Sequence, residues 1–255
     1  MKNQLSVSVL VPVFNEEKTI ADILEKLISL EYVNEIVVIN DCSTDSTEQT
    51  IQRFNSSKLV YFKLPFNQGK TAAIKKAKEL ATKDVLVIQD ADLEYDPEEL
   101  FDVLNPIFLN QADVVYGSRF LVKKTSRVLY FYHYLANKTL TFISNFLTNI
   151  NFTDIETCYK AFRQEIFKPM PLTSKGFGME VEITAMISKL PIRIFEVPIS
   201  YYGRTYEEGK KIGATDGFMA LYYILYFNIV APFLDPHMSY IKKIRKSKIH
   251  HHHVL

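Results

Sequence analysis

Residues 5–40 read LSVSVLVPVFNEEKTIADILEKLISLEYVNEIVVIN and contain a strand pattern, a helix pattern and a second strand pattern. The first nine residues are an apolar, β-branched run, residues 15–30 predict a helix because their apolar side chains from Ile20 to Ile28 have helical spacing, and EIVVIN is again apolar. Similar patterns follow, with strands at 59–64, 84–89 and 113–116 and helices at 43–54, 71–82, 97–109 and 129–150. This alternation predicts an α/β fold with a mostly parallel, Rossmann-like sheet flanked by helices.

The composition is that of a globular protein without disulfides. Of the 255 residues 47% are hydrophobic, which is enough for a sizeable core. The net charge of +1 gives no argument for nucleic acid as a partner, and two cysteines without metal-ligand spacing exclude a disulfide scaffold and a zinc site. No signal-peptide pattern opens the sequence, so we expect a cytoplasmic location.

The last 38 residues differ in character from the rest. In residues 218–234 the only clearly polar side chain is Asn228, and residues 238–255 carry five Lys or Arg and no acid. An apolar run of 17 residues is short for a membrane-spanning helix, which needs ~20 residues. We therefore expect an amphipathic helix at a membrane interface, with the basic tail on anionic lipid. The alternative is a core helix followed by a solvated tail.

Acidic side chains follow the predicted strands. Asn15 and Glu16 come after the first strand, Asp41 after the second, and Asp90 and Asp92 directly after residues 84–89. In parallel sheets these positions line the ligand crevice. Carboxylates at 90, 92 and 94 are the hard oxygen ligands that Mg²⁺ or Mn²⁺ prefers. A DxD sequence by itself is usually a solvated turn, but its place after a buried strand favours a metal site.

Six motifs in order resemble those of the family 2 glycosyltransferases, in particular the dolichyl-phosphate mannose synthase and polyprenyl-phosphate glycosyltransferase group. They are VPVFNEE at 11–17, NDCSTD at 40–45, NQGK at 67–70, DAD at 90–92, GSR at 117–119 and the stretch 197–204. The resemblance implies a GT-A fold, a nucleotide-sugar donor, a divalent metal and inversion at the anomeric carbon. It also implies a catalytic domain at 1–217, with a nucleotide-sugar half at 1–120 and an acceptor half at 121–217, and a membrane-interfacial segment at 218–255.

Carried over by position, the resemblance implies three sets of site residues. The donor-binding set is Pro12, Asn15, Glu16, Asp41, Lys70 and Asp90. The metal set is Asp90, Asp92 and Glu94, and the acceptor-phosphate set is Arg119, Arg127 and Arg204. Arginine suits a phosphate because its planar fork donates two hydrogen bonds at once. The structural alternatives are a helix cap for Asp41, solvated side chains for Lys70 and Arg127, and a plain surface loop around Arg204.

Asp154 and Glu156 bear on the class of acceptor. Family members that glycosylate a hydroxyl need a general base, and either carboxylate is a candidate by its place in the order. Members that glycosylate a phosphate need none, because a phosphomonoester with a second pKa near ~6 is already largely ionised. The resemblance to the phosphate-acceptor group makes Asp154 a positioning or metal-side residue, and it implies Asp92, Arg119 and Asp154 as the catalytic set.

The sequence thus leads us to expect a metal-dependent, inverting hexosyltransferase. It would move a sugar from GDP-mannose or a UDP-hexose to a polyprenyl or dolichyl phosphate. We expect it to be a peripheral protein on the cytoplasmic face of a membrane. It would act there with a membrane partner subunit or as a homo-oligomer. One alternative is transfer to a hydroxyl in polysaccharide or glycolipid synthesis. Another is a non-catalytic membrane-associated subunit, which the intact DAD and arginine motifs argue against. No GxGxxG follows a strand, which disfavours a dinucleotide oxidoreductase.

Overall fold

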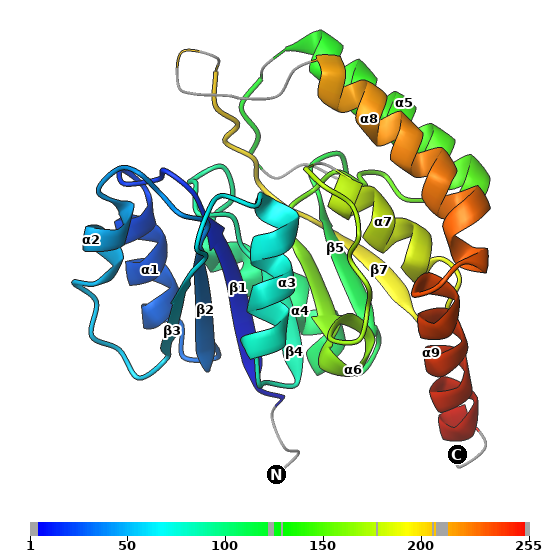
Figure 1. Cartoon of the computed structure of the whole chain (residues 1–255), viewed down its shortest axis with the longest axis horizontal. Coiled ribbons are helices and arrows are strands. Elements are labelled where there is room, and N and C mark those ends of the chain that lie inside the picture. Colours follow the sequence, from blue (N-terminus) through cyan, green and yellow to red (C-terminus); the bar gives the residue numbers. More distant parts are fainter. Residues whose placement is uncertain are drawn as a thin grey trace.

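A seven-stranded sheet with helices on both sides forms the centre of the molecule (Figure 1). The computed structural model describes residues 5–121, 125–128, 130–176, 178–205, 207 and 214–252. In sheet order the strands are β3 (Leu59–Lys63), β2 (Glu35–Asn40), β1 (Val7–Val13), β4 (Val85–Ile88), β6 (Lys160–Arg163), β5 (Val114–Ser118) and β7 (Ile194–Pro198).

All strand pairs are parallel except those of β6, which runs antiparallel to both β4 and β5. The predicted α/β class with a mostly parallel sheet is therefore confirmed. Strand β6 went unpredicted because its four residues, KAFR, are too few to show a period.

The helices connect these strands and cover the sheet. They are α1 (Ile20–Ser29), α2 (Thr47–Ile51), α3 (Lys70–Leu80), α4 (Leu100–Phe108) after the 3₁₀ turn η1 (Pro97–Glu99), α5 (Phe131–Thr148), α6 (Gln164–Phe167), α7 (Gly178–Ile187), α8 (Ala214–Leu225), its continuations η2 (Tyr226–Val230) and η3 (Ala231–Phe233), and α9 (His237–His252). Helix α1 begins only at Ile20, because Asn15 has a left-handed φ of 54° that a helix does not allow.

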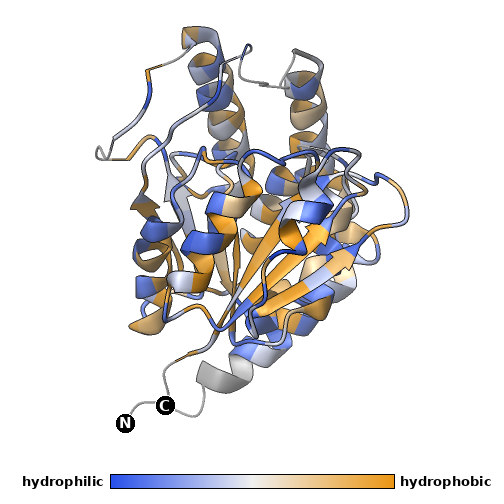
Figure 2. Ribbon diagram, turned by 90° about the vertical axis from the view of Figure 1, so that its left-hand side faces the viewer, coloured by the Kyte–Doolittle hydropathy of each residue, from blue (hydrophilic) through white to orange (hydrophobic). Residues whose placement is uncertain are grey.

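The core lies around the three strands β1, β2 and β4. Every residue of these strands is buried, and Figure 2 shows hydrophobic residues concentrated in the strands. Since successive side chains point to opposite faces, burial of all of them means that both faces are covered. This explains why the strands have continuous Val and Ile runs rather than an alternating pattern. The loops after the buried strands are left at one edge of the sheet.

Helices α5 and α8 lie side by side beyond that edge (Figures 1 and 2). Both expose apolar stripes: Phe131, Leu135, Phe142 and Phe146 on α5, and Phe218, Tyr222, Leu225, Ile229 and Phe233 on α8 and its continuations. Among the described residues, the stretch Thr215–Phe233 has the length and composition of a membrane-crossing helix, with a mean hydropathy of 1.2 and 22% of it buried. These helices therefore present an exposed apolar surface.

Helix α9 packs back onto the domain. Its buried apolar side chains are Tyr240, Ile241 and Ile244. At its start, His237 Nε2 lies 2.7 Å from Oε1 of the buried Glu182, and near its end Lys248 Nζ lies 2.7 Å from Glu165 Oε1. Residues 238–248 are thus attached to the protein, unlike the basic appendage expected from composition, because apolar residues interrupt the lysines. The division of the chain at residue 217 stays a prediction.

The close contact between α7 and α8 generates a stability prediction. A Cβ atom at Gly178 would lie 2.4 Å from the ring of Tyr223, which stacks on Phe227 and accepts a hydrogen bond from the Lys175 backbone at 3.3 Å. We expect Gly178→Ala to lower the free energy of unfolding by about 1–3 kcal/mol, because the added methyl group would displace a ring that is held by its stacking and its hydrogen bond. Urea denaturation measures this.

Gly217→Ala is the matched control for this prediction. Gly217 lies on α8, and a Cβ atom added there would have no neighbour within 4 Å, so alanine should leave stability unchanged or raise it by up to ~1 kcal/mol. Equal stability of the Gly178→Ala and wild-type proteins would contradict a tight contact between the two helices.

Candidate active site

The edge at which the parallel strands end gathers polar side chains from distant parts of the chain. Glu16 follows β1, Asp90 and Asp92 follow β4, Arg119 follows β5 by one residue, and Arg204 lies in the loop after β7. Carboxyl ends of parallel strands meet at one edge, which explains the grouping. The structure brings Glu16 and Asp92 into contact with Arg204, whereas Asp90 and Arg119 have other partners.

Arg204 binds three carboxylates. Its Nη2 lies 3.1 Å from Glu16 Oε1 and 2.7 Å from Asp92 Oδ2, and its Nη1 lies 3.2 Å from Glu16 Oε2. Its backbone N–H donates to Glu94 Oε1 at 2.7 Å. Arg204 therefore ties the loops after β1, β4 and β7 together, which is more than the plain surface loop considered from the sequence.

Negative charge is concentrated at Asp92. Burial, together with the charges of Asp90 and Glu94, raises the pKa of Asp92 to about 7, although Arg204 acts in the opposite direction. The ion pairs with Asp92 and Glu16 in turn raise the pKa of Arg204 above its usual range, against the effect of burial. The site would thus be stabilised by additional positive charge.

Lys70 forms the second ion-paired centre. It is the first residue of α3, directly after Gly69, whose φ of 85° lets the chain turn into the helix. Its Nζ lies 2.8 Å from Asp90 Oδ1 and 3.4 Å from Glu180 Oε1. The alternative of a freely solvated lysine is therefore wrong.

Asp41 and Asn15 hold the surrounding loops. The two carboxylate oxygens of Asp41 accept hydrogen bonds from the N–H groups of Gln68 and Gly69, each at 2.7 Å. Asp41 thus supports the turn before α3 rather than the start of the helix near residue 43. Asn15 Oδ1 accepts from a backbone N–H of the loop after β2 at 2.8 Å, and Pro12 is buried within β1.

Arg119 and Asp154 form a bidentate ion pair. The distances are 2.6 Å from Nε to Oδ2 and 2.7 Å from Nη2 to Oδ1, and the Arg119 backbone N–H also donates to Oδ2 at 3.2 Å. The Asp154 side chain is 0% exposed and that of Arg119 is 12% exposed. The ring of Tyr201 lies 5.1 Å from the guanidinium carbon. Asp154 therefore fixes the orientation of Arg119.

Aromatic contacts join Arg119 to α5. The next residue, Phe120, packs edge-on against Tyr134 of that helix with ring centroids 5.3 Å apart. Lys138, one turn further along α5, has its Nζ 5.1 Å from the Phe120 ring centroid. The arginine is thus adjacent to the helix that carries one of the exposed apolar stripes.

Arg127 and Glu156 occupy different surroundings. Arg127 is exposed, its N–H donates to the Tyr201 carbonyl at 2.8 Å, and its Nη1 donates to the Gly203 carbonyl at 3.3 Å. Glu156 has a buried Oε1 with no hydrogen-bond partner among the described residues. Burial and the charge of Glu180 raise the pKa of Glu156 to about 8. Arg127 therefore borders the Arg204 loop, whereas Glu156 is half-buried.

Asp90, Asp92 and Glu94 fit a divalent cation by donor type and by charge. They offer hard carboxylate oxygens, and burial together with the charges of Asp90 and Glu94 raises the pKa of Asp92. Within the described part of the chain, however, no three His, Cys, Asp or Glu side chains converge on one point. Asp90 faces Lys70, and Asp92 and Glu94 face Arg204.

Two contributors were absent from the predicted site. Tyr201 covers Arg119 and donates its hydroxyl to Glu94 at 3.1 Å, and Glu180 contacts Lys70. The motif around Arg204 includes Tyr201, so its position in YYGR was a usable signal. Glu180 lies outside the six motifs; the sequence marks it as one of two acids in GMEVE at 178–182 but gives it no role.

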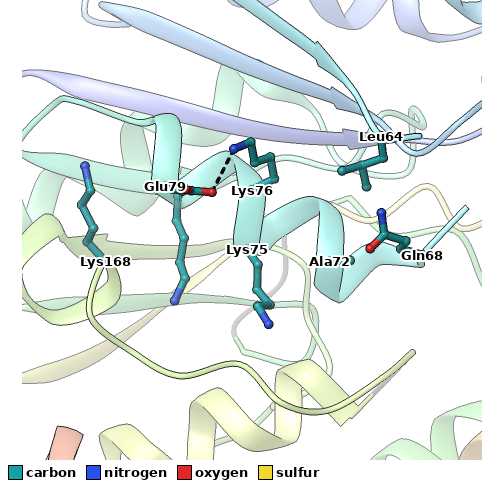
Figure 3. A pocket seen from close by; sticks show the side chains of 8 residues that line it. Leu64, Gln68, Ala72, Lys75, Lys76, Glu79 and Lys168 are labelled. Atoms are coloured by element: carbon teal, nitrogen blue, oxygen red, sulfur yellow. Dashed lines mark hydrogen bonds and ion pairs between the residues drawn. The ribbon is translucent and has the colours of Figure 1, made fainter. Parts of the chain in front are cut away.

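A basic groove on α3 lies apart from these carboxylates. Its volume is about 530 Å³, and its lining is Leu64, Gln68, Ala72, Lys75, Lys76, Lys78, Glu79 and Lys168 (Figure 3). The lining includes none of the predicted site residues. Lys76 pairs with Glu79 at 3.0 Å, as Figure 3 shows. The groove is therefore not part of the candidate site.

Solved structures with the same fold include enzymes with bound nucleotide. Glucosyl-3-phosphoglycerate synthase of Mycobacterium tuberculosis in complex with UDP has a TM-score of 0.69 and 17% identity, covering 89% of this chain and 81% of that one. Its complex with Mn²⁺, UDP and phosphoglyceric acid has a TM-score of 0.68 and 17% identity, covering 90% and 80%. At this identity the likeness concerns the fold, and it agrees with the predicted GT-A type.

Three curated relatives are similar in sequence. Glycosyltransferase AglJ of Haloferax volcanii is 30% identical over 201 residues, which are 78% of this chain and 64% of that protein. The dolichol-phosphate mannosyltransferase of Pyrococcus furiosus is 28% identical, with 83% and 60% covered. The UDP-N-acetylglucosamine–dolichyl-phosphate N-acetylglucosaminyltransferase of Methanococcus voltae is 26% identical, with 86% and 94% covered. The chain thus spans less than two thirds of the length of two of these relatives.

The family is shown by a broader match. The model of glycosyl transferase family 2 matches residues 8–170, which is more than half of the chain and contains β1 to β6 together with Asp92, Arg119 and Asp154. The protein therefore belongs to the family 2 glycosyltransferases.

Proposed function

We propose that this glycosyltransferase moves a sugar from a nucleotide-diphosphate donor, GDP-mannose or a UDP-hexose, to a polyprenyl or dolichyl phosphate, with inversion at the anomeric carbon. The observation that carries the proposal is the buried ion pair between Arg119 and Asp154. Relatives named for dolichyl-phosphate acceptors support the same class of acceptor.

The ion pair bears on the acceptor through proton transfer. A hydroxyl acceptor needs a carboxylate that is free to take its proton. Asp154 is fully buried with both oxygens on Arg119, so it is not free to take a proton. A phosphate acceptor needs no base, and an oriented arginine is the group that would bind it.

On the donor side, Asp90, Asp92 and Glu94 would hold Mg²⁺ or Mn²⁺. When bound, such an ion supplies positive charge to the departing nucleotide diphosphate. Asn15, Glu16 and Asp41 lie at the ends of β1 and β2, where the nucleoside would bind. Lys70 adds an ammonium group at the N-terminus of α3, a position that favours anions. Structures of the same fold with UDP and Mn²⁺ support this arrangement.

The reaction would be a single displacement. An oxygen of the acceptor phosphate attacks the anomeric carbon, and the bond from that carbon to the diphosphate oxygen breaks with its electron pair on the leaving nucleotide. Arg119 would orient the acceptor phosphate through its remaining N–H groups. Arg127, whose Nη1 donates to the Gly203 carbonyl, would add positive charge on the acceptor side, whereas Arg204, the third predicted phosphate ligand, is paired with Glu16 and Asp92.

We further propose that the apolar stripes of α5 and α8 rest on the cytoplasmic face of a membrane. Exposed Phe and Tyr side chains on neighbouring helices suit the headgroup boundary of a bilayer. The contact between Phe120 and Tyr134 connects this surface to Arg119. A lipid phosphate could therefore reach the arginine with its chain still near the bilayer. A partner subunit or a second copy stays an expectation from the sequence.

The metal assignment predicts the behaviour of Asp92→Asn. The carboxamide keeps the size of the side chain but removes the charge that would hold the cation, so turnover with Mg²⁺ or Mn²⁺ should fall by about two orders of magnitude. Transfer assays with nucleotide sugars and a short polyprenyl phosphate measure it, and circular dichroism checks the fold. Asp22→Asn, the same change on the exposed side of α1, is the control. Full activity of Asp92→Asn would rule out the assignment.

The acceptor assignment predicts a selective effect of Arg119→Lys. Losing the planar fork should lower kcat/KM for the lipid phosphate by about 10- to 100-fold and leave the donor KM nearly unchanged. The control is Arg193→Lys, because Arg193 forms a similar two-point pair with Asp113 but is 48% exposed and outside the site. If Asp154→Asn instead abolished transfer to a sugar hydroxyl while Arg119→Lys had no effect, the acceptor would be a hydroxyl.

The membrane assignment predicts weaker vesicle binding by the double variant Phe142→Ser, Phe146→Ser. These side chains are 71% and 79% exposed on one stripe of α5. Removing two aromatic rings should weaken binding to phosphatidylcholine–phosphatidylglycerol vesicles at least about tenfold, at low and at high salt, because the apolar contribution is not screened. Leu109→Ser, at a 59% exposed residue after α4, should bind like the wild type. Cosedimentation that is equal for all three proteins would contradict the assignment.

A further inference from the structure

Glu180 is a buried acid next to the donor side of the site and outside the six motifs. It lies in the first turn of α7 and is 4% exposed. Its Oε1 lies 3.4 Å from Lys70 Nζ, and its Oε2 is buried without a hydrogen-bond partner among the residues that the structure describes. A buried carboxylate in such a position needs a compensating charge, and Lys70 is the cation in contact with it.

Lys70 lies between two carboxylates that come from different elements. Asp90 follows β4 and contacts the ammonium at 2.8 Å, and Glu180 contacts it from α7 at 3.4 Å. The Lys70 side chain as a whole is 31% exposed, and its ammonium lies between the two carboxylates. Burial acts to lower the pKa of Lys70, but Asp90 and other neighbouring anionic groups, Glu180 among them, raise it well above its usual range. The lysine therefore stays charged.

Donor binding would change the balance between these two partners. On the proposed function Asp90 serves the divalent cation and the donor, so it no longer holds Lys70 by itself. A lysine side chain has a flexible four-carbon stem and would leave its position if no second partner held it. Glu180 is placed to be that partner.

We propose that Glu180 is a positioning residue that keeps the Lys70 ammonium beside the donor diphosphate when Asp90 turns to the metal. This inference rests on the proposed function and assigns Glu180 a role in donor binding. Glu180 itself touches neither the donor nor the reacting atoms and acts through Lys70.

A second lysine lies near Glu180 in addition to Lys70. Lys160 is buried near it, with its Nζ donating to the Thr157 carbonyl and lying 4.7 Å from the Tyr116 ring centroid. Lys160 and Glu180 are close enough for their charges to act on each other. Two lysines, Lys70 and Lys160, thus lie near Glu180.

A simple charge effect and a positioning effect have opposite signs here. If Glu180 acted only as a negative charge near the donor, neutralising it would tighten binding of an anionic nucleotide. If Glu180 positions Lys70, neutralising it frees the lysine and weakens binding. Calorimetric titration of the full chain with UDP and with GDP, in the presence of Mn²⁺, distinguishes the two without any measurement of turnover.

We expect Glu180→Gln to raise the Kd of the bound nucleotide about tenfold, the usual consequence of losing one charge-assisted contact. The control is Glu79→Gln, the same substitution at the exposed partner of Lys76 on α3, which should leave the Kd unchanged. If folded Glu180→Gln binds the nucleotide as tightly as the wild type or more tightly, the role of Glu180 is overturned but the proposed function is not. If the wild type binds neither nucleotide, the donor half of the proposed function fails, and this inference fails with it.

Two further variants test whether the effect passes through Lys70. In a Lys70→Gln background, Glu180→Gln should add less than about twofold to the Kd, because the group it positions is gone. If the increases in Kd caused by Lys70→Gln and Glu180→Gln instead multiplied in the double variant, the inference would be overturned. Should Glu180→Gln fail to fold, Glu180→Asp keeps the charge but withdraws the carboxylate by one methylene group. It should raise the Kd about threefold, and an unchanged Kd would contradict the role.

Discussion

The ion pairs of Arg204 are the interaction on which the arrangement of the site depends. Glu16, Asp92 and Glu94 come from two neighbouring parallel strands, and without a cation they would repel one another in a half-buried space. Arg204 reaches them from the loop after β7, which is one of the two outermost strands of the sheet, the other being β3. These ion pairs thus hold the loop after β7 against the loops after β1 and β4.

The central fold could be predicted from the sequence because its strands are long apolar runs. Strands β1, β2 and β4 are buried on both faces, so most of their residues are apolar and the run is easy to recognise in the sequence. Short or locally atypical elements could not be predicted. Strand β6 has four residues, α1 starts late because of the backbone at Asn15, and α9 attaches through apolar residues scattered among lysines. In each case tertiary contacts outweigh the local pattern.

The sequence predicted which loops lie together where the parallel strands end, but not which of their side chains pair. Asp92 and Arg204 are 112 positions apart, and Arg119 and Asp154 are 35 apart, so their contacts depend on the order of strands across the sheet. The same residue types fit several pairings. Asp154 has the chemistry of a base or of an orienting group, and only its burial against Arg119 separates the two. Glu180 had no motif, because its importance comes from its distance to Lys70.

The spacing between Arg119 and the apolar helices fits the physical nature of a lipid phosphate. Such an acceptor joins a charged group that needs hydrogen-bond donors to a chain whose transfer into water costs about 0.8 kcal/mol per CH₂. A phosphate site far from the bilayer would require several of these groups to cross water. Here Phe120 follows Arg119 directly and packs on Tyr134 of α5. The same helix carries an exposed stripe of apolar side chains. The phosphate of the proposed acceptor would therefore bind Arg119, and its apolar chain would contact the apolar stripe of α5. This arrangement favours a lipid phosphate over a soluble hydroxyl as the acceptor.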